Sequence, residues 1–375
     1  MGRRTQLKKK VIIIGAGPYG ISLAYELWRK DISFEIIGQP FDLWMKHTMP
    51  KMAIRSDRHS SEIYSKDKAF DLTKFIYRHE PKQAKKILKD RLPSELYRDY
   101  LRDVLEKLPF PIKKEKVVDV QKTTRSFVCR TESGELLESH SVIVATGIEN
   151  HKVVPDNLKN NVPVIHSWDV GDHLSVEAKD ILLIGGGQSA AEAAEHFSKT
   201  NRVTWVMRKS PIFYSEPINL PKPLFKAALL LSPYFYFLPK VFKKSLGRKF
   251  VETTITPDMM KVLSKDNVTL LCSEAEALDL SSESTQAYSR TLQTKFDLIL
   301  AATGYRYDLE NLSFLGEEIR KNVDTNDGIP AINYNFESSL PGLYFVGGIV
   351  EPSYGPAQRF LMGARHVTHR LGKVL

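Results

Sequence analysis

The chain has few cysteines and lacks the patterns of redox-active or metal-binding cysteine pairs. Its 375 residues contain only Cys129 and Cys272, which lie far apart and outside any Cys-x-x-Cys pattern. A disulfide framework, a zinc ribbon and a dithiol redox centre are therefore disfavoured, and a reducing, cytoplasmic compartment is expected. His, Asp and Glu do not recur at metal-ligand spacing, so we expect no metal site.

We expect no targeting segment, and the sequence has no basic tract. Glycines interrupt the first apolar run at once, which indicates a solvated tail before the first strand rather than a secretory signal, and the myristoylation pattern is absent. The 54 Lys and Arg outnumber the 44 Asp and Glu, for a net charge of +10, but are spread over the chain. With no nucleic-acid motif we expect no nucleic-acid partner. Peripheral contact with a membrane or with an acidic carrier protein remains compatible with the positive charge.

Two glycine-rich loops are the most informative motifs. The apolar residues 11–14 lead into Gly-Ala-Gly-Pro-Tyr-Gly at 15–20, and 181–184 lead into Gly-Gly-Gly-Gln-Ser-Ala at 185–190. In each, a strand is followed by a tight turn that opens a helix. The backbone N–H groups and the helix dipole can then hold a pyrophosphate where a Cβ would block its approach. Two such loops predict two dinucleotide sites.

The residues that follow each loop differ. About 20 residues beyond such a loop, the next strand should end at a charged residue. An acidic side chain there binds a ribose hydroxyl, and a basic side chain binds a 2′-phosphate. The strand at 202–207 ends at Arg208 and Lys209, which predicts NADPH, because a guanidinium pairs bidentately with a phosphate that NADH lacks. The strand at 33–37 ends at Gly38, so ribose recognition at the first site is not predicted.

An internal repeat sets the expected domain plan. Apolar strands at 142–144 and 298–301 each end in an Ala-Thr-Gly turn, at 145–147 and 302–304, where the chain must pass close to a ligand or reverse direction. The fold class is therefore α/β, with two nested Rossmann-like dinucleotide-binding domains. Short strands in polar surroundings are expected at 116–120, 126–130, 135–137 and, in the second copy, 268–272. The first domain is expected at 1–155, the inserted second domain at 165–297, and the return of the first at 298–375.

The segment 221–250 stands apart from the repeat. Its apolar and aromatic residues are followed, within the segment, by Lys243, Lys244, Arg248 and Lys249. Its short apolar run and its prolines exclude a helix that spans a membrane. A substrate lid, a surface that touches lipid or a partner, and an ordinary helical pair that covers the second domain all remain open.

Together these motifs resemble the two-dinucleotide flavoprotein monooxygenases, and especially their N-hydroxylating branch with its bacterial relatives. The loop at 15–22 is similar to that branch's FAD loop, and the Gln-Ser-Ala-x-Glu continuation at 188–192 to its NADPH loop. Residues 41–56 resemble the segment along the flavin. Residues 342–348 and 355–360 resemble the closing FAD strand and the helix that points at the isoalloxazine. His166-Ser167-Trp168 keeps only part of the heteroatom-oxygenating signature, which favours the N-hydroxylating branch.

The resemblance implies FAD in the first domain and NADPH in the second. It implies oxygen transfer from O₂ to a small nucleophilic substrate, an amine by analogy, through a flavin C4a-hydroperoxide, with the chemistry carried by the cofactors and no catalytic side chain assigned. The implied cofactor-binding residues are Gly15, Gly17, Pro18, Gly20, Trp44, His47, Arg55, Gly147, Gly185, Gly187, Gln188, Ser189, Arg208, Lys209, Thr303, Gly347, Gly348, Gly355 and Phe360. An NADPH-dependent flavoprotein reductase without a dithiol centre is the alternative, and a non-catalytic nucleotide sensor is a third.

Overall fold

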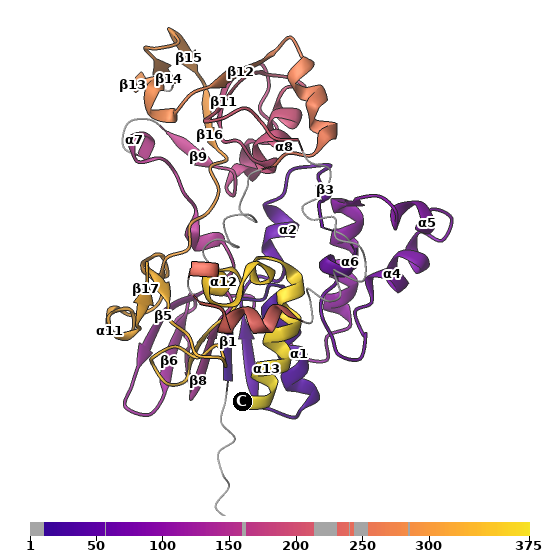
Figure 1. The fold of residues 1–375 in the computed structure, drawn as a ribbon, viewed down its shortest axis with the longest axis vertical. Coiled ribbons are helices and arrows are strands. Elements are labelled where there is room, and N and C mark those ends of the chain that lie inside the picture. Colours follow the sequence, from indigo (N-terminus) through magenta and orange to yellow (C-terminus); the bar gives the residue numbers. More distant parts are fainter. Residues whose placement is uncertain are drawn as a thin grey trace, which may run out of the picture.

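The computed structural model describes residues 11–56, 58–159, 163–213, 231–239, 241–243, 254–283 and 286–375. These residues form two lobes, each built on its own parallel sheet (Figure 1). The predicted segment 221–250 lies outside the described residues except at 231–239 and 241–243. No helix among the described residues has the length and apolar character needed to cross a membrane.

The first lobe contains a four-stranded parallel sheet in the order β19-β8-β1-β2. Its strands are β1 (Val11–Ile14), β2 (Phe34–Ile37), β8 (Ser141–Val144) and β19 (Leu343–Phe345). Every residue of β1 is buried, which explains why this strand is apolar throughout rather than alternating. Helices α1 (Pro18–Arg29) and α13 (Ala364–Val374) pack side by side against this core (Figure 1).

The second lobe contains a five-stranded parallel sheet in the order β12-β11-β10-β16-β9. Its strands are β9 (Val164–His166), β10 (Asp180–Ile184), β11 (Arg202–Met207), β12 (Val268–Cys272) and β16 (Leu298–Ala301). The helix α8 (Gln188–Phe197) follows β10 as α1 follows β1. In the first sheet β1, which precedes the glycine loop, lies between β2 and β8, the strand before the Ala-Thr-Gly turn. In the second sheet β10 lies in the same way between β11 and β16. The internal repeat therefore extends to strand order.

Two expectations about this repeat were wrong. Residues 298–301 were assigned to the returning first domain, but β16 pairs in parallel with β10, so the second lobe ends after this strand. Residues 268–272 were taken as the counterpart of the short polar strands, but β12 is the edge of the parallel sheet. The counterpart is the antiparallel meander β13 (Leu280–Glu283), β14 (Gln286–Ser289) and β15 (Thr294–Phe296). Chain order alone does not distinguish an edge strand of the main sheet from a meander.

In the first lobe the short strands form where they were predicted. The antiparallel sheet consists of β5 (Val117–Lys122), β6 (Phe127–Thr131) and β7 (Leu136–Ser139). The remaining small elements are α7 (Asp156–Lys159), α11 (Glu317–Asn322), β17 (Thr325–Asn326), β18 (Ile329–Pro330), α12 (Glu351–Tyr354) and the 3₁₀ helices η1 (Glu149–His151), η2 (Val170–His173), η3 (Ser232–Phe237), η4 (Pro257–Ser264), η5 (Ala275–Leu278), η6 (Leu309–Asn311), η7 (Gly348–Val350), η8 (Pro356–Arg359) and η9 (Leu361–Gly363).

A helical extension lies beside the first lobe. It contains α2 (Asp42–Lys46), β3 (Ala53–Ile54), α3 (Arg58–Ser61), α4 (Leu72–His79), α5 (Ala84–Ile87), β4 (Leu92–Pro93) and α6 (Ser94–Glu106) (Figure 1).

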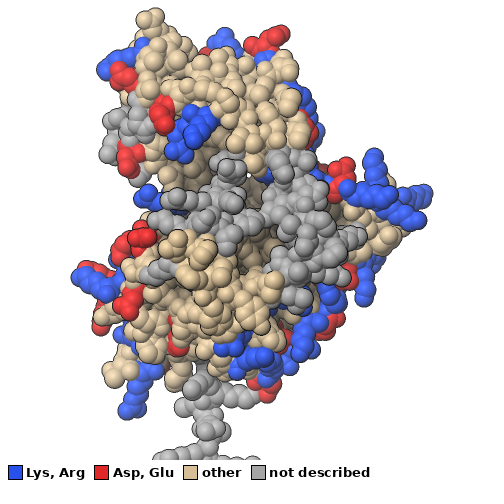
Figure 2. Space-filling view, viewed as in Figure 1, with Lys and Arg blue, Asp and Glu red and all other residues tan. Residues whose placement is uncertain are grey.

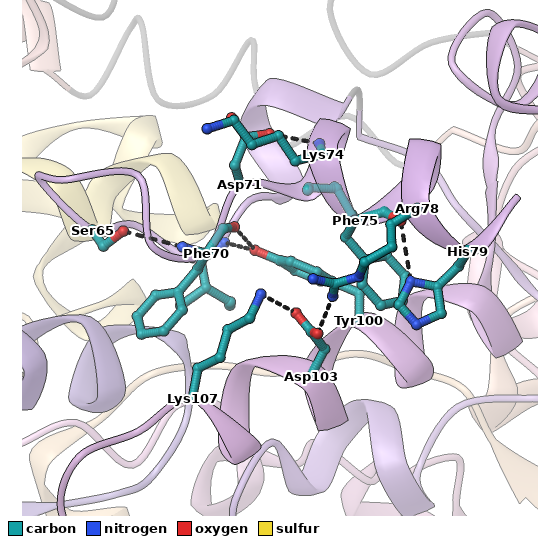
Figure 3. A network of polar contacts seen from close by, with 12 residues as sticks. Ser65, Phe70, Asp71, Lys74, Phe75, Arg78, His79, Tyr100, Asp103 and Lys107 are labelled. Atoms are coloured by element: carbon teal, nitrogen blue, oxygen red, sulfur yellow. Dashed lines mark hydrogen bonds and ion pairs between the residues drawn. The ribbon is translucent and has the colours of Figure 1, made fainter. Parts of the chain in front are cut away.

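Buried polar contacts hold the extension together. The buried Tyr100 hydroxyl donates to Phe70 O at 2.6 Å and accepts from Ile63 N, so one side chain fixes the loop before α4 (Figure 3). The Asp71 carboxylate caps α4 by accepting from Lys74 N at 2.9 Å. These contacts fix the loop before α4 and the first turn of α4 within the extension.

Candidate functional site

A cleft of about 310 Å³ opens at the carboxyl ends of β1, β2, β8 and β19, where the loops after these strands meet. Ligands of open α/β sheets bind at this edge. The lining residues are 14–19, 37–39, 41–44, 115–117, 145–150, 346–348 and 358–361 together with Trp168, Tyr307 and Phe314. The cleft thus brings together Gly15, Gly17, Pro18, Trp44, Gly147, Gly347, Gly348 and Phe360 from the predicted set.

The three glycines of the first loop have different physical roles. Gly15 has a φ of +114°, and a Cβ on it would lie 2.3 Å from Ala145 O. A Cβ on Gly20 would lie 1.9 Å from Gly15 O, so the protein's own packing requires both glycines. Gly17 differs, because its φ of −81° suits any residue and a Cβ there would meet no atom within 4 Å. The space beside Gly17 at the N-terminus of α1 is therefore available to a ligand, and anions are stabilised at such a position.

The opposite wall of the cleft carries an unpartnered polar group. Gln358 is buried, and its Oε1 has no hydrogen-bond partner among the described residues. The Tyr19 hydroxyl lies 2.8 Å from both Gln358 O and Phe360 O, which fixes this wall to the first turn of α1. A buried acceptor without a donor is costly, so a bound N–H or O–H group is its expected partner.

An aromatic pair closes another side of the cleft. Trp44 on α2 packs edge-on against Tyr97 of the helical extension, with ring centroids 5.8 Å apart. Trp168, which follows β9, stacks on His47 at 4.1 Å. His47 itself does not line the cleft. Its Nδ1 lies 2.6 Å from Trp168 O and its Nε2 lies 3.0 Å from Asp42 Oδ2, so it connects α2 to Trp168.

The second glycine loop repeats the geometry of the first. Gly185 has a φ of +143°, and a Cβ on it would lie 2.2 Å from Ala302 O. Gly187 is the N-cap of α8, and Ser189 is exposed in its first turn. Gly304 has a φ of +82° and open space beside it, as Gly147 has in the first lobe. Thr303 uses its hydroxyl to bond Val153 O in the connection between the lobes.

The basic pair predicted to follow β11 lies at the end of this strand that faces the second glycine loop. Arg208 and Lys209 are exposed directly after the strand, beside the second glycine loop, and no partner is seen for either within the part of the chain that the structure describes. In contrast, Arg202 at the other end of β11 is paired with Asp180.

Gln188 serves the protein's own packing. Its Nε2 donates to Glu192 Oε1 at 2.7 Å and to Thr256 Oγ1 at 3.0 Å, and its Oε1 accepts from Thr256 N at 2.8 Å. Burial raises the pKa of Glu192. The side chain of Gln188 therefore fixes the residues before η4 to the N-terminus of α8.

Arg55 lies at the contact between the lobes and does not line the cleft. Its guanidinium donates to Thr254 O at 2.9 Å and to Thr254 Oγ1 at 2.8 Å. Nearby, Arg91 Nη2 pairs with Asp258 Oδ1 at 2.7 Å. Both arginines come from the helical extension, and both partners come from the inserted lobe. Arg55 thus joins the lobes, although the resemblance implied a flavin contact.

The two chain segments that connect the lobes, 151–153 and 304–306, lie side by side between the second Ala-Thr-Gly turn and the cleft. Val153 N donates to Gly304 O at 3.0 Å, and Arg306 N donates to His151 O at 2.8 Å, so the two connections run antiparallel. His166 Nε2 donates to Gly304 O at 3.1 Å, while its Nδ1 accepts from Trp168 N at 3.1 Å. Burial lowers the pKa of His166, in keeping with this neutral form. His166 is thus a structural residue between the second turn and Trp168.

The predicted helix after the closing strand is interrupted. The chain forms the short turns η8 and η9 before α13 begins at Ala364. Gly355 has a φ of +90° and lies beneath the Phe235 ring, which a Cβ would approach to 2.7 Å. The described part of the segment 221–250 therefore packs on the first lobe, which excludes for this part a helical pair that covers the second domain.

Sequence reasoning missed several cleft residues. Gln39, Lys116 and Tyr307 line the cleft but come from distant parts of the chain without a motif around them. Arg359 also lines the cleft; it lies in the segment 355–360 singled out above but was not among the implied binding residues. The absence of an acid at Gly38 has a steric cause, because a Cβ there would lie 2.8 Å from Ala16 N. The next residue, Gln39, is the first after β2 whose side chain can reach the cleft.

Residues 12–226, more than half of the sequence, match the family described as pyridine nucleotide-disulphide oxidoreductase. The chain belongs to this family. It is thus an oxidoreductase, although Cys129 is buried in β6 and Cys272 is exposed in β12, so the two thiols cannot form a dithiol centre. Burial raises the pKa of the Cys129 thiol to about 12.

Curated relatives are distant. The uncharacterized oxidoreductase CzcO of Bacillus subtilis (strain 168) is 26% identical over 54% of this chain and 55% of its own length. The chain therefore spans about half the length of this relative. A ferredoxin–NADP reductase of Lactobacillus delbrueckii subsp. bulgaricus is 24% identical over 89% of this chain and 86% of its own length.

Solved structures share the fold over the whole chain. The ornithine N-hydroxylase of Kutzneria sp. 744, with reduced FAD, NADP⁺ and L-ornithine, has a TM-score of 0.77 at 16% identity and covers 98% of both chains. L-lysine 6-monooxygenase from Pseudomonas syringae has a TM-score of 0.74 at 18% identity, covering 98% of this chain and 100% of its own. The bacillithiol disulfide reductase of Staphylococcus aureus has a TM-score of 0.65 at 18% identity, covering 98% of both chains.

Proposed function

We propose that the chain is an FAD-dependent, NADPH-consuming monooxygenase that transfers one oxygen atom from O₂ to a small nucleophilic substrate, an amine by analogy with its structural neighbours. In this proposal the first lobe binds FAD and the nested second lobe binds NADPH. The observation that carries it is the pair of matching glycine loops: the first lines the cleft, and the turn opposite the second is linked to the cleft through His166 and Trp168.

The residues of the first cleft fit FAD. The open space beside Gly17 at the N-terminus of α1 accepts a pyrophosphate, and the unpartnered Gln358 Oε1 accepts a hydrogen bond. Gln39 is suitably placed for ribose recognition at the end of β2. When bound, FAD supplies the two-electron chemistry, with NADPH and O₂ as co-substrates.

The second loop fits NADPH. Arg208 and Lys209 lie where the 2′-phosphate of NADPH is expected, and Gly304 leaves open space opposite the loop. The ornithine N-hydroxylase neighbour holds NADP⁺ in the same fold, which supports this assignment.

The walls of the cleft would exclude water from the reacting atoms. Trp44, Trp168 and Tyr307 supply three aromatic side chains. Burial raises the pKa of Tyr307 to about 12, so its hydroxyl stays protonated at neutral pH and can donate a hydrogen bond into the site. Oxygen transfer needs such exclusion, whereas electron transfer to an external acceptor does not.

Product analysis tests the proposal. The purified protein is supplied with NADPH, isotopically labelled O₂ and a panel of amines that includes L-ornithine, L-lysine and cadaverine, and mass spectrometry follows labelled hydroxylamines. Label in a product supports the monooxygenase. NADPH oxidation that needs an added electron acceptor and never labels an amine would favour a reductase, the activity of two of the similar proteins.

A further inference from the structure

The 3₁₀ helix η3 has one face packed on the first lobe and one face exposed. A 3₁₀ helix has three residues per turn, so residues three apart lie in line. Phe235 covers Gly355, and the Tyr236 hydroxyl donates to Ile332 O at 3.1 Å. The Tyr236 ring lies 5.0 Å from the Tyr354 ring. These contacts fix η3 on the lobe through its inner face.

The other face carries large apolar side chains that remain in solvent. Leu231, Tyr234 and Phe237 follow one another at intervals of three and are 61%, 63% and 62% exposed. Beyond η3, Val241 is 78% exposed and Phe242 is 61% exposed. We call Leu231, Tyr234, Phe237, Val241 and Phe242 the exposed ridge. Figure 2 shows that the front of the lower lobe, where η3 lies, is largely free of charged side chains, which lie mainly around its margin.

The charge of the surrounding sequence is of one sign. Between Glu216 and Glu252 there is no acidic residue. The basic residues of this stretch are Lys222, Lys226, Lys240, Lys243, Lys244, Arg248 and Lys249. Lys243 is anchored by a 2.6 Å hydrogen bond from its Nζ to Tyr236 O, so at least this cation is held beside the ridge.

We propose that the exposed ridge docks this protein on an anionic phospholipid surface. Apolar and aromatic side chains enter the boundary between headgroups and acyl chains, while Lys243 beside the ridge and the positive charge of the stretch 217–251 attract acidic headgroups. A surface of acidic lipid accommodates both the apolar ridge and the cations. Pro233 lies in the first turn of η3 and Pro239 follows its end, and η3 has only six residues, so this helix lies on the surface and does not cross it.

Vesicle flotation of the full chain tests the proposal. Two vesicle types are used, pure phosphatidylcholine and an equal mixture of phosphatidylcholine and phosphatidylglycerol. We expect the protein to float with the mixed vesicles at least tenfold more than with the neutral ones and to be released by high salt. The double variant Val241→Glu with Phe242→Glu, at positions with no catalytic role, should lower the bound fraction at least tenfold.

A matched control distinguishes the ridge from exposed apolar residues in general. Leu136 on β7 is 65% exposed on the first lobe, and Leu136→Glu should bind the mixed vesicles as the original protein does. Flavin content and thermal midpoint confirm that the variants are folded. The proposal is overturned if the original protein ignores both vesicle types or if the double variant binds as well as the original. It is also overturned if light scattering shows that the ridge joins two copies of the chain, with the double variant monomeric.

Discussion

Replacing Gly17 by valine should remove the flavin without unfolding the protein. The backbone at Gly17 has an ordinary φ of −81°, and a Cβ there meets no protein atom within 4 Å. The fold should therefore lose no more than about 1 kcal/mol, the usual range for an unfavourable N-cap residue. The valine side chain would instead occupy the space in which we place the FAD pyrophosphate. Losing two charge-assisted hydrogen bonds at about 1.5–3 kcal/mol each would weaken FAD binding by roughly 10²- to 10⁴-fold.

The neighbouring glycines provide the contrast. Gly20→Ala places a Cβ 1.9 Å from Gly15 O, and Gly15→Ala places one 2.3 Å from Ala145 O at a φ of +114°. Overpacking and backbone strain of this kind cost about 1–3 kcal/mol each, so these two variants should lose stability as well as flavin. Flavin absorbance after dialysis, titration of the apoprotein with FAD and urea unfolding of the apoprotein separate the two effects. A Gly17→Val protein that holds FAD as tightly as the original would refute the assignment of the cleft. An apoprotein as unstable as Gly15→Ala would show that Gly17 is structural.

Three further outcomes are expected. Arg208→Ala should raise the KM for NADPH roughly 10- to 150-fold and leave the KM for NADH nearly unchanged, because only NADPH has the 2′-phosphate. Arg202→Ala, at the other end of β11, is the matched control. Equal effects of Arg208→Ala on both coenzymes would contradict the assignment. Burial lowers the pKa of His151 from 6.5 to about 4, so the unfolded chain takes up the proton first. Stability should therefore be full well above pH 6.5 and fall as the pH drops toward 4, by an amount of the order of 3 kcal/mol. His151→Asn should flatten the pH dependence of the thermal midpoint, and an unchanged slope would count against this cause. Trp168→Ala should open the cleft and raise the amount of peroxide released per NADPH oxidised, while FAD stays bound. An unchanged ratio of peroxide to NADPH would show that Trp168 does not exclude water from the cleft.

The sequence predicted well those features whose cause is local. The glycine loops, the strands before them and the Ala-Thr-Gly turns are each specified by a few adjacent residues, and the structure has the strands and turns at these positions. The basic pair after β11 was also predictable, because it follows the strand by chain distance alone.

Features that depend on long-range packing could not be predicted. Residues 298–301 look the same in sequence whichever sheet they join, and only the pairing of β16 with β10 assigns them to the second lobe. Tyr307 lines the cleft because the returning chain folds over the first loop, and no local pattern marks it. Arg55 has a partner in the other lobe, Thr254, which is 199 residues away in the chain.

The contacts of Gln188 show why a motif does not by itself assign a role to each of its residues. The Gln-Ser-Ala-x-Glu pattern was the most specific part of the second loop, and the resemblance implied that its glutamine binds the nucleotide. In the structure the side chain amide is fully engaged, with Glu192 on the same helix and with Thr256 before η4. Glu192 is also the last residue of the pattern, so both side chains of the motif act together on the packing of the loop. The side chains of a pattern can therefore shape the loop, and in the function we propose the backbone N–H groups of that loop and the cations after β11 bind the ligand.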